Sequence, residues 1–301
     1  KDGYRMSRKS GINLISKQYG KKGPFAESWV RMRSNPGAVT GLAILVILLL
    51  VMVYSFFFIS YEQVTAMNPA DRFQPPSAAH PFGTDDMGRD LFVRVLYGIR
   101  YSMAVGFGAI ALAVVIGTFL GIISGFYGGT LDSILMRALD IWASIPALLM
   151  GMVIVAVFGN NLLILMCAIG ITSVPGFARI TRAGVITVKG EEYIEASRAI
   201  GMTSFRTAFT QALPNSLSPL IVTVTARIGT AILEASSLSF LGFGVPVPTP
   251  EWGALVSAGR NYLRTAPHIT LFPGLFIMIT VFACSLLGDG LRDALDPRLK
   301  R

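Results

Sequence analysis

The chain has 301 residues, of which 52% are hydrophobic and only 14% are charged, and its formal net charge is +9. Soluble domains carry roughly 25% charged residues, so this composition argues against a soluble globular protein. Nucleic-acid binding is not indicated either, because the basic residues are not interleaved with aromatic ones. The apolar residues instead gather in runs of bilayer length, which is about 20 residues for a helix.

The first predicted element is a basic N-terminal segment. Nine Lys and Arg residues precede the first apolar run, which is the bias expected of a cytoplasmic segment. Within it, Phe25–Arg33 has apolar residues on one side of a helix and basic residues on the other. We therefore predict a cytoplasmic tail over residues 1–38 that contains a short interfacial helix. The apolar run that follows is too long for a signal peptide and is expected to be a retained span.

Six membrane-spanning helices are predicted in chain order. They cover residues 39–60, 103–126, 135–158, 162–180, 217–241 and 270–288. With this order, 19 of the 26 Lys and Arg residues fall on the inner side and six on the outer side, which places both termini in the cytoplasm. The fold class is an all-α membrane protein. Residues 61–102 form an extracytoplasmic loop, 103–288 the core domain and 289–301 a cytoplasmic tail.

The outer loop contains three aspartates close together: Asp85, Asp86 and Asp90. A calcium loop of the EF type would need a glutamate about eleven residues after the first aspartate, where Leu96 stands. The residues after Asp90 predict instead an Asp-capped amphipathic helix on the outer membrane surface. Its apolar residues would face lipid or the helical bundle.

The longest inner loop, about residues 182–216, is patterned as two helices. Gly190 and the two acidic residues after it predict a helix start, and Gly201 predicts its C-terminal end. A second helix is expected to begin at Thr203 or Ser204 and to end at Pro214. One face of the first helix is small and apolar, as a shallow groove of another protein would require, and it comprises Tyr193, Ala196, Ser197 and Ile200. Periodicity alone is equally compatible with a loop packed on the membrane surface.

This inner loop resembles the coupling loop of ABC importer permeases, which carries Glu-Ala-Ala, a later Gly and then Leu-Pro. The chain has Glu195-Ala196-Ser197, then Gly201, then Leu213-Pro214, so a serine replaces the second alanine. Gln211 stands where the family usually has a branched apolar residue. The resemblance implies docking on a separate ATPase subunit through Glu192, Tyr193, Glu195, Ala196, Ser197, Ala199, Gly201, Leu213 and Pro214.

Three further segments are similar to the C-type permease subunit of dipeptide, oligopeptide and nickel importers. They are Gly83–Ser102, Phe240–Gly244 with Pro250–Gly253, and Gly288–Pro297. The resemblance covers about residues 35–301 and implies the bundle of a type I ABC importer permease. The outer signature residues are Gly83, Thr84, Asp85, Gly88, Arg89, Asp90 and Arg94. The residues implied to face the binding protein are Pro250, Glu251, Trp252 and Gly253.

The resemblance implies a permease subunit that moves dipeptides or oligopeptides across the bacterial cytoplasmic membrane by alternating access. The chain has no Gly-x-x-x-x-Gly-Lys-Ser/Thr motif, so no cofactor is expected in it. ATP and magnesium are expected in two partner ATPase subunits. The other expected partners are a homologous second permease subunit in a heterodimer, an extracytoplasmic substrate-binding protein and the lipid bilayer, with no nucleic acid. Nickel chelates and glutathione are alternative substrates, and a stand-alone secondary transporter or a membrane scaffold are alternative functions.

Two ionisable residues, Arg227 and Glu234, lie inside the fifth predicted span. Charges in lipid are costly and usually face a cavity, a partner or each other. Seven residues apart, these two project on nearly the same side but are too distant for a tight pair on a straight helix. They are candidates for the translocation path, where they would meet the charged ends of a peptide; packing against the sister permease is the alternative. Because His80 and His268 fall in outer loops, no catalytic or metal site is predicted in the membrane.

Overall fold

The computed structural model describes residues 24–295. The predicted tail residues 1–23 and 296–301 lie outside the described residues. In the described range the chain is helical, and strand pairing is limited to one isolated bridge between Thr84 and Asp90. The predicted all-α class is therefore confirmed.

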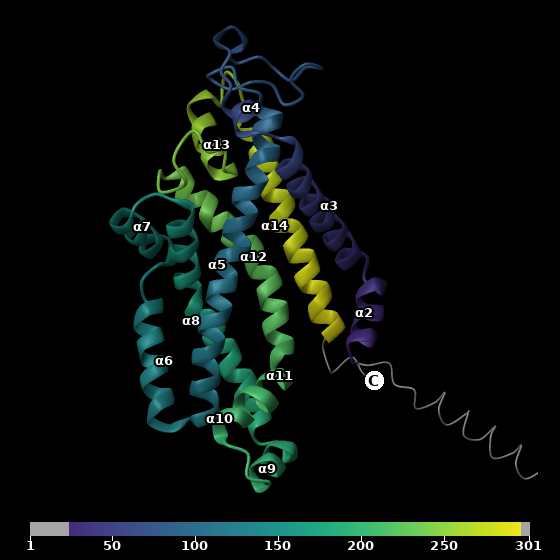
Figure 1. The fold of residues 1–301 in the computed structure, drawn as a ribbon, viewed down its shortest axis with the longest axis vertical. Coiled ribbons are helices and arrows are strands. Elements are labelled where there is room, and N and C mark those ends of the chain that lie inside the picture. The colour runs from purple at the N-terminus through teal and green to yellow at the C-terminus, as the bar shows by residue number, and fades with distance from the viewer. Residues whose placement is uncertain (1–23, 296–301) are drawn as a thin grey trace, which may run out of the picture.

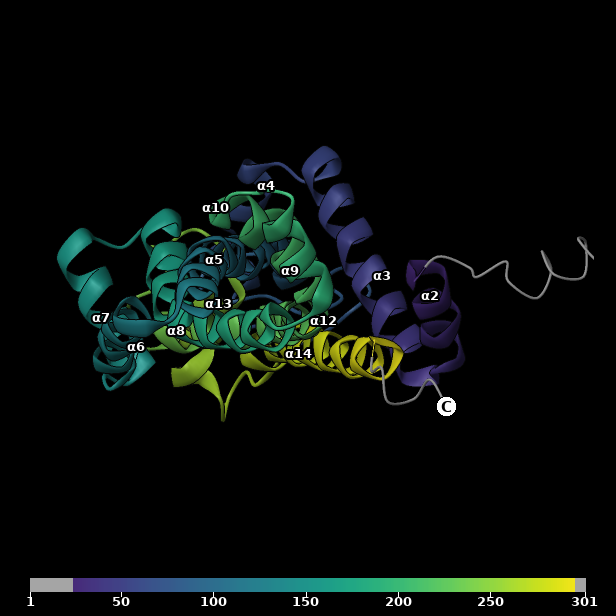
Figure 2. The same cartoon turned by 90° about the horizontal axis from the view of Figure 1, so that it is seen from below.

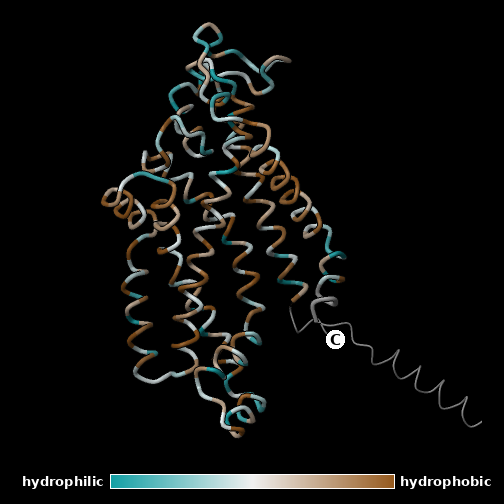
Figure 3. The backbone as a smooth tube through the Cα atoms, in the orientation of Figure 1, coloured by the Kyte–Doolittle hydropathy of each residue, from teal (hydrophilic) through white to brown (hydrophobic). Residues whose placement is uncertain are grey.

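Among the described residues, five helices are long and apolar enough to cross a membrane. They are α3 (Pro36–Phe58), α5 (Leu91–Tyr127), α8 (Leu162–Lys189), α12 (Leu217–Phe240) and α14 (His268–Leu295). A sixth candidate span is the pair α6 (Gly129–Ala143) and α7 (Ala147–Phe158), which is bent by 82°. The long helices run along the long axis of the molecule (Figure 1). Hydrophilic residues gather at its two ends, with hydrophobic helices between them (Figure 3).

Short helices lie near the ends of this bundle. They are α2 (Pro24–Ser34), α4 (Tyr61–Thr65), α9 (Glu192–Ala199), α10 (Ser204–Thr207), α11 (Leu213–Asn215) and α13 (Trp252–Gly259). A π-helical turn, Ala208–Ala212, joins α10 to α11, and short 3-10 turns cover Pro69–Asp71 and Arg260–Tyr262. Helices α4 and α13 lie at one end of the molecule and α9 at the other (Figure 1). Seen from below, α2 and α3 are on one side and α6 and α7 on the opposite side (Figure 2).

Four predicted boundaries are wrong. The sixth span does not end at residue 288, because α14 continues to Leu295 and includes the first residues of the predicted tail. The helix predicted on the outer surface is not separate, because α5 continues from Leu91 to Tyr127 without a break and contains both it and the second span. The third span is not one straight helix over 135–158 but the bent pair α6–α7. The fourth span does not end at residue 180, since α8 continues to Lys189 and carries the chain toward α9.

Close packing of α5 on α8 organises the core. A Cβ atom at Gly117 would lie 2.6 Å from the Phe177 Cβ, and one at Gly121 would lie 2.5 Å from the Ala178 carbonyl oxygen. Glycine spaced by four residues lets two helix backbones approach closely in a membrane bundle. Gly117 and Gly121 of α5 therefore serve helix packing. The main apolar core forms where α5, α7, α8 and α12 meet.

Candidate functional site

Helix α9 lies at the end of the molecule opposite the outer loop and is fixed to the bundle by one side (Figure 1). Ile194 is fully buried and packs on apolar residues of α5, α8 and the π-helical turn. Ser197 is 8% exposed, and its Oγ donates to the Tyr193 carbonyl oxygen at 2.8 Å. The sequence pattern missed Ile194 as the anchor of this helix. The sequence Tyr-Ile-Glu could have indicated this burial, because it places one aliphatic side chain between two residues with polar groups.

The opposite side of α9 is an exposed surface with apolar members. Tyr193, Ala196 and Ile200 are exposed, Ile200 by 79%, and Phe205 of the next helix is 57% exposed. Three of the four residues predicted to share a face are therefore on the surface, and Ser197 is not because it lies beside Ile194. Partial burial, with Glu191 nearby, raises the pKa of the Tyr193 phenol. Exposed apolar side chains at a hydrophilic end are typical of an interaction surface.

Gly201 ends α9 as predicted. Its φ is +84°, a value that L side chains rarely adopt. The Gly201 N–H donates to the Arg198 carbonyl at 2.9 Å, and the Met202 N–H donates to the Ser197 carbonyl at 3.1 Å. This is the hydrogen-bond pattern of a left-handed helix terminus. The predicted start is off by one residue, because Glu191 rather than Gly190 is the residue before the first turn.

The second arm of the loop starts as predicted, at Ser204 with Thr203 as its cap. Its end differs slightly from the prediction, because Pro214 lies within α11 and the helical run continues to Asn215. The helix before it is interrupted by the π-helical turn, in which Ala208 and Ala212 are fully buried. Asn215 Nδ2 donates to the Gln211 carbonyl at 2.7 Å. The arm is thus a compact turn packed on α5, and its buried alanines also contact Ile194 of α9.

Arg227 and Glu234 both lie on α12 and approach each other. Their Nη1 and Oε1 atoms are 3.9 Å apart, with the two side chains 41% and 36% exposed. The contact is a long one, as expected of two residues that are too distant for a tight pair, and it forms because the two long side chains extend toward each other across a helix rise of about 10 Å. The Arg227 Nη2 lies over Gly176 of α8. Glu234 shares a small cavity with Thr172 of α8 and with Ala147 at the start of α7.

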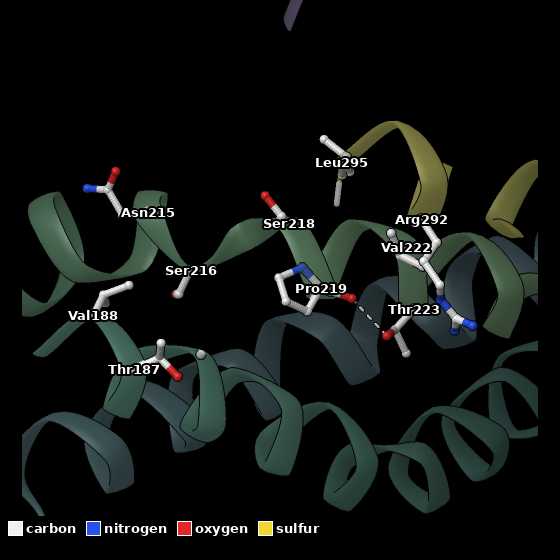
Figure 4. A pocket seen from close by; sticks show the side chains of 11 residues that line it. Thr187, Val188, Asn215, Ser216, Ser218, Pro219, Val222, Thr223, Arg292 and Leu295 are labelled. Carbon is white, nitrogen blue, oxygen red and sulfur yellow. Dashed lines mark hydrogen bonds between the residues drawn. The ribbon is translucent and has the colours of Figure 1, made fainter. Parts of the chain in front are cut away.

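A larger cleft opens at the base of α12, toward the loop that carries α9 (Figure 4). It measures about 460 Å³ and lies between the ends of α8 and α14 and the start of α12. Hydroxyl and amide groups of Thr187, Asn215, Ser218 and Thr223 line it, together with the guanidinium of Arg292. The sequence analysis missed this cleft. The polar residues at the start of the fifth span could have indicated it, because such residues are unusual where a helix enters lipid.

The outer signature is a buried ion-pair cluster centred on Asp85. One of its oxygens lies 2.7 Å from Arg89 Nε and 3.6 Å from Arg94 Nε, and the other accepts two backbone N–H groups. Asp86 lies 3.7 Å from Arg89 Nη2, and Asp90 lies 2.7 Å from His80. Arginine and histidine side chains therefore face these carboxylates.

Two glycines let the outer loop turn around this cluster. Gly83 and Gly88 both have positive φ, and a Cβ atom at Gly88 would lie 1.8 Å from the Asn68 carbonyl oxygen. Thr84 Oγ1 accepts from the Gln74 N–H at 2.9 Å and donates to the Asp71 carbonyl. Asp90 caps the start of α5 by accepting from the Val93 N–H. The signature residues thus fold the loop onto α5.

The residues predicted to face the binding protein are not on the surface. Pro250, Glu251, Trp252 and Gly253 are all buried, with Glu251 and Trp252 fully so. Glu251 accepts from two N–H groups at the start of α13, and Trp252 Nε1 donates to the Val95 carbonyl at 2.9 Å. These side chains hold α13 against α5. The exposed part of the same loop is earlier in the chain, where Val247 is 75% exposed.

Comparison with known proteins agrees with this geometry. The family described as binding-protein-dependent transport system inner membrane component matches residues 117–301, and the N-terminal transmembrane domain of oligopeptide transport permease C matches residues 23–76. The dipeptide transport system permease protein DppC of Alkalihalophilus pseudofirmus is 44% identical over 283 residues, which cover 94% of this chain and 93% of that protein.

The other relatives are named either as dipeptide or as glutathione transport permeases. DppC of Haemophilus influenzae is 40% identical, covering 93% of this chain and 97% of that protein. The glutathione transport system permease protein GsiD of Pectobacterium atrosepticum is 39% identical, covering 92% of each chain. A solved structure of the methionine ABC transporter MetNI, in an inward-facing conformation, shares the fold with a TM-score of 0.56 at 20% identity, covering 68% of this chain and 96% of that one. The chain therefore belongs to the family of binding-protein-dependent transport system inner membrane components, as a DppC- or OppC-like ABC importer permease.

Proposed function

We propose that this chain forms half of a path through which dipeptides or other short peptides enter the cell. The observation that carries this proposal is the similarity to DppC over 94% of the chain, at 44% identity. Membership of the family makes the protein a multi-pass component of the inner membrane and a transport subunit, with ATP hydrolysis in a separate subunit. A substrate-binding protein and a second permease are the other partners that the family implies.

The end of the molecule that carries α9 is proposed to be cytoplasmic, together with both chain termini. Six passes, with α6–α7 counted as one, return the described chain to the side from which it starts. The end of α14 and the start of α3 both lie toward the α9 end (Figure 1). The exposed residues Tyr193, Ile200 and Phe205 offer the contact surface for the ATPase, and ATP and magnesium bind to that partner.

The second permease is proposed to be a homologous but distinct chain, so that the two form a heterodimer around the path. Arg227 and Glu234 support a path on the α8–α12 side, because an exposed ion pair within a span needs a polar environment. A peptide zwitterion carries one charge of each sign. Its carboxylate could pair with Arg227 and its ammonium group with Glu234, at the expense of their long contact of 3.9 Å.

Glutathione is the second candidate substrate, because relatives named glutathione transport permeases are 39% identical to the chain. Glutathione is itself a short peptide with free carboxylate and ammonium groups. The same pair of charges would therefore suit it, and the binding protein would then decide between the two substrates.

Uptake in proteoliposomes tests the proposal. The chain is reconstituted with the second permease, the ATPase and the binding protein, and uptake of a labelled dipeptide, glutathione and a nickel chelate is compared. ATP-dependent accumulation of the dipeptide supports the proposal, and accumulation of glutathione alone supports the second candidate. Uptake of any of them by this chain alone, driven by an ion gradient, would identify a secondary transporter and refute the proposal.

A further inference from the structure

The bent pair α6–α7 contains a break in the middle of a membrane span. Helix α6 ends at Ala143 and α7 begins at Ala147, with a bend of 82° across Ser144-Ile145-Pro146. Pro146 causes the break, because its ring removes an N–H donor and disfavours helix in the residue before it. The break lies at about mid-height of the bundle, where α6 follows the lower part of α8 and α7 turns away (Figure 1).

Backbone polar groups are left without partners at this break. The last bonds of α6 are made by the Ser144 N–H to the Asp140 carbonyl at 3.0 Å and the Ile145 N–H to the Trp142 carbonyl at 3.4 Å. The α7 ladder starts with the Met150 N–H, which donates to the Pro146 carbonyl. Within residues 24–295, the carbonyls of Ser144 and Ile145 and the N–H groups of Leu148 and Leu149 make no hydrogen bond.

These groups also lie on the surface of the chain. Every residue from Asp140 to Leu149 is exposed. Unpaired backbone at membrane depth is not tolerated against lipid; it occurs where the backbone is covered by protein or lines a water-filled cavity. The break therefore does not face hydrocarbon, although the side chains beside it, such as Ile145 and Leu149, are apolar.

The neighbours of the break favour water. Ala147 and Leu148 line the same small cavity as Thr172 and Glu234, so a carboxylate and a hydroxyl lie beside the start of α7. Arg227 follows at 3.9 Å from Glu234. Water can serve unpaired donors, unpaired acceptors and both charged groups at once, whereas the packed surface of another helix would need a matching partner for each.

We propose that the α6–α7 break lines the aqueous path through the membrane, with its free carbonyl and N–H groups facing water or the polar groups of a transported molecule. The peptide backbone of the break forms the wall of the path beside Glu234. This inference deepens the proposed function by naming a second wall of the path, and it holds for any polar substrate.

Thiol labelling in the complete importer, in membrane vesicles, tests this inference. Both native cysteines are first replaced, as Cys167→Ala and Cys284→Ala, and Ser144→Cys is introduced. A charged methanethiosulfonate reagent, which does not enter lipid, is applied without nucleotide and after trapping with ATP and vanadate. The control is Ala113→Cys, because Ala113 is fully buried in the core of this chain. We expect labelling of Ser144→Cys about tenfold faster than the control, or more, in at least one state, because only water-exposed thiols ionise and react.

Labelling of Ser144→Cys below that ratio in both states would overturn the inference, whether lipid or the second permease covers the break. If Ser144→Cys does not assemble, Ala147→Cys takes its place under the same criterion. The result is separable from the proposed function. Slow labelling with normal peptide uptake would refute only the aqueous wall, and fast labelling without peptide uptake would refute only the proposed substrate.

Discussion

The Ser102 hydroxyl donates to Glu251 Oε1 at 3.2 Å, inside the protein, and accepts from the Trp252 N–H at the same distance. Glu251 is fully buried, with no positive side chain among its hydrogen-bond partners. Ser102 is the last residue of the outer signature, and Glu251 lies in the motif that was predicted to contact a binding protein. Two motifs that are 149 residues apart in sequence are therefore one structural unit. Gly98 completes it, because a Cβ atom there would lie 2.0 Å from the Pro250 carbonyl oxygen.

Replacing Ser102 should destabilise the protein. Ser102→Ala leaves a buried carboxylate oxygen and a buried N–H with fewer partners, and we expect a loss of about 1–3 kcal/mol in the free energy of unfolding. Thermal unfolding of the purified protein in detergent measures this loss. Ser133→Ala is the matched control, because the exposed Ser133 hydroxyl only donates to the Gly129 carbonyl within its own helix. Equal melting temperatures for the two variants would contradict the structural role of Ser102.

The sequence predicted the helices well where hydrophobicity alone decides them. The bounds of α3 and α12 differ from prediction by at most a few residues, because lipid selects apolar residues along the whole span. The break in the third span was not predicted, although Pro146 was visible. Proline is tolerated inside other spans of this chain, as Pro175 in α8 and Pro273 in α14, so its presence does not reveal a break.

The sites were predicted less evenly than the helices. Gly201 was found because only a left-handed turn requires glycine there. The burial of Glu251 and Trp252 was missed, because the family resemblance implied that they face a binding protein and their partner Ser102 is about 150 residues earlier in the sequence. These contacts between distant segments depend on the packing of α13 on α5. The hydrophobic pattern of a single segment does not reveal which other segment it packs against.

Gly201→Ala should weaken coupling without disturbing the membrane bundle. At a φ of +84°, an L residue costs about 1–2 kcal/mol, and the terminus of α9 would shift to relieve the strain. We expect lower ATP-dependent uptake at unchanged expression. Gly190→Ala is the control, because Gly190 has a φ of −89° and open space around it. Uptake reduced equally in both variants would show that the conformation at residue 201 is not the cause.

A charge on the exposed side of α9 should weaken ATPase docking. Ile200 is 79% exposed and makes little contact with its own chain, so Ile200→Asp should leave the thermal stability of the isolated subunit within about 0.5 kcal/mol. Copurification with the ATPase is expected to fall several-fold. Val247→Asp changes an equally exposed apolar residue at the other end of the molecule and should copurify normally. Normal ATPase recovery with Ile200→Asp would mean that docking uses another surface.

Two ion pairs hold α6 against α8, and they should differ in strength. Arg182 and Asp132 are joined by two hydrogen bonds of 2.6 Å at 33% and 17% exposure, whereas Arg179 and Asp140 are joined by one of 2.8 Å at 47% and 64% exposure. A double-mutant cycle with Asp132→Asn and Arg182→Gln, measured as the free energy of unfolding, should give a coupling energy of about 1 kcal/mol after allowing for solvent screening. The cycle with Asp140→Asn/Arg179→Gln should give roughly 0.3 kcal/mol. The opposite order would contradict the geometry.

Neutral variants of the α12 pair test the path itself. If Glu234 and Arg227 meet the charged ends of a peptide, Glu234→Gln and Arg227→Gln should each lower the rate of peptide uptake about tenfold or more, since each removes a charged hydrogen bond of roughly 1.5–3 kcal/mol. Assembly with the ATPase and the second permease, measured by copurification, should remain normal. If the pair instead packs against the second permease, the same variants should lose assembly first, and uptake should fall in proportion. Wild-type uptake in both variants, with normal assembly, would exclude these residues from the path.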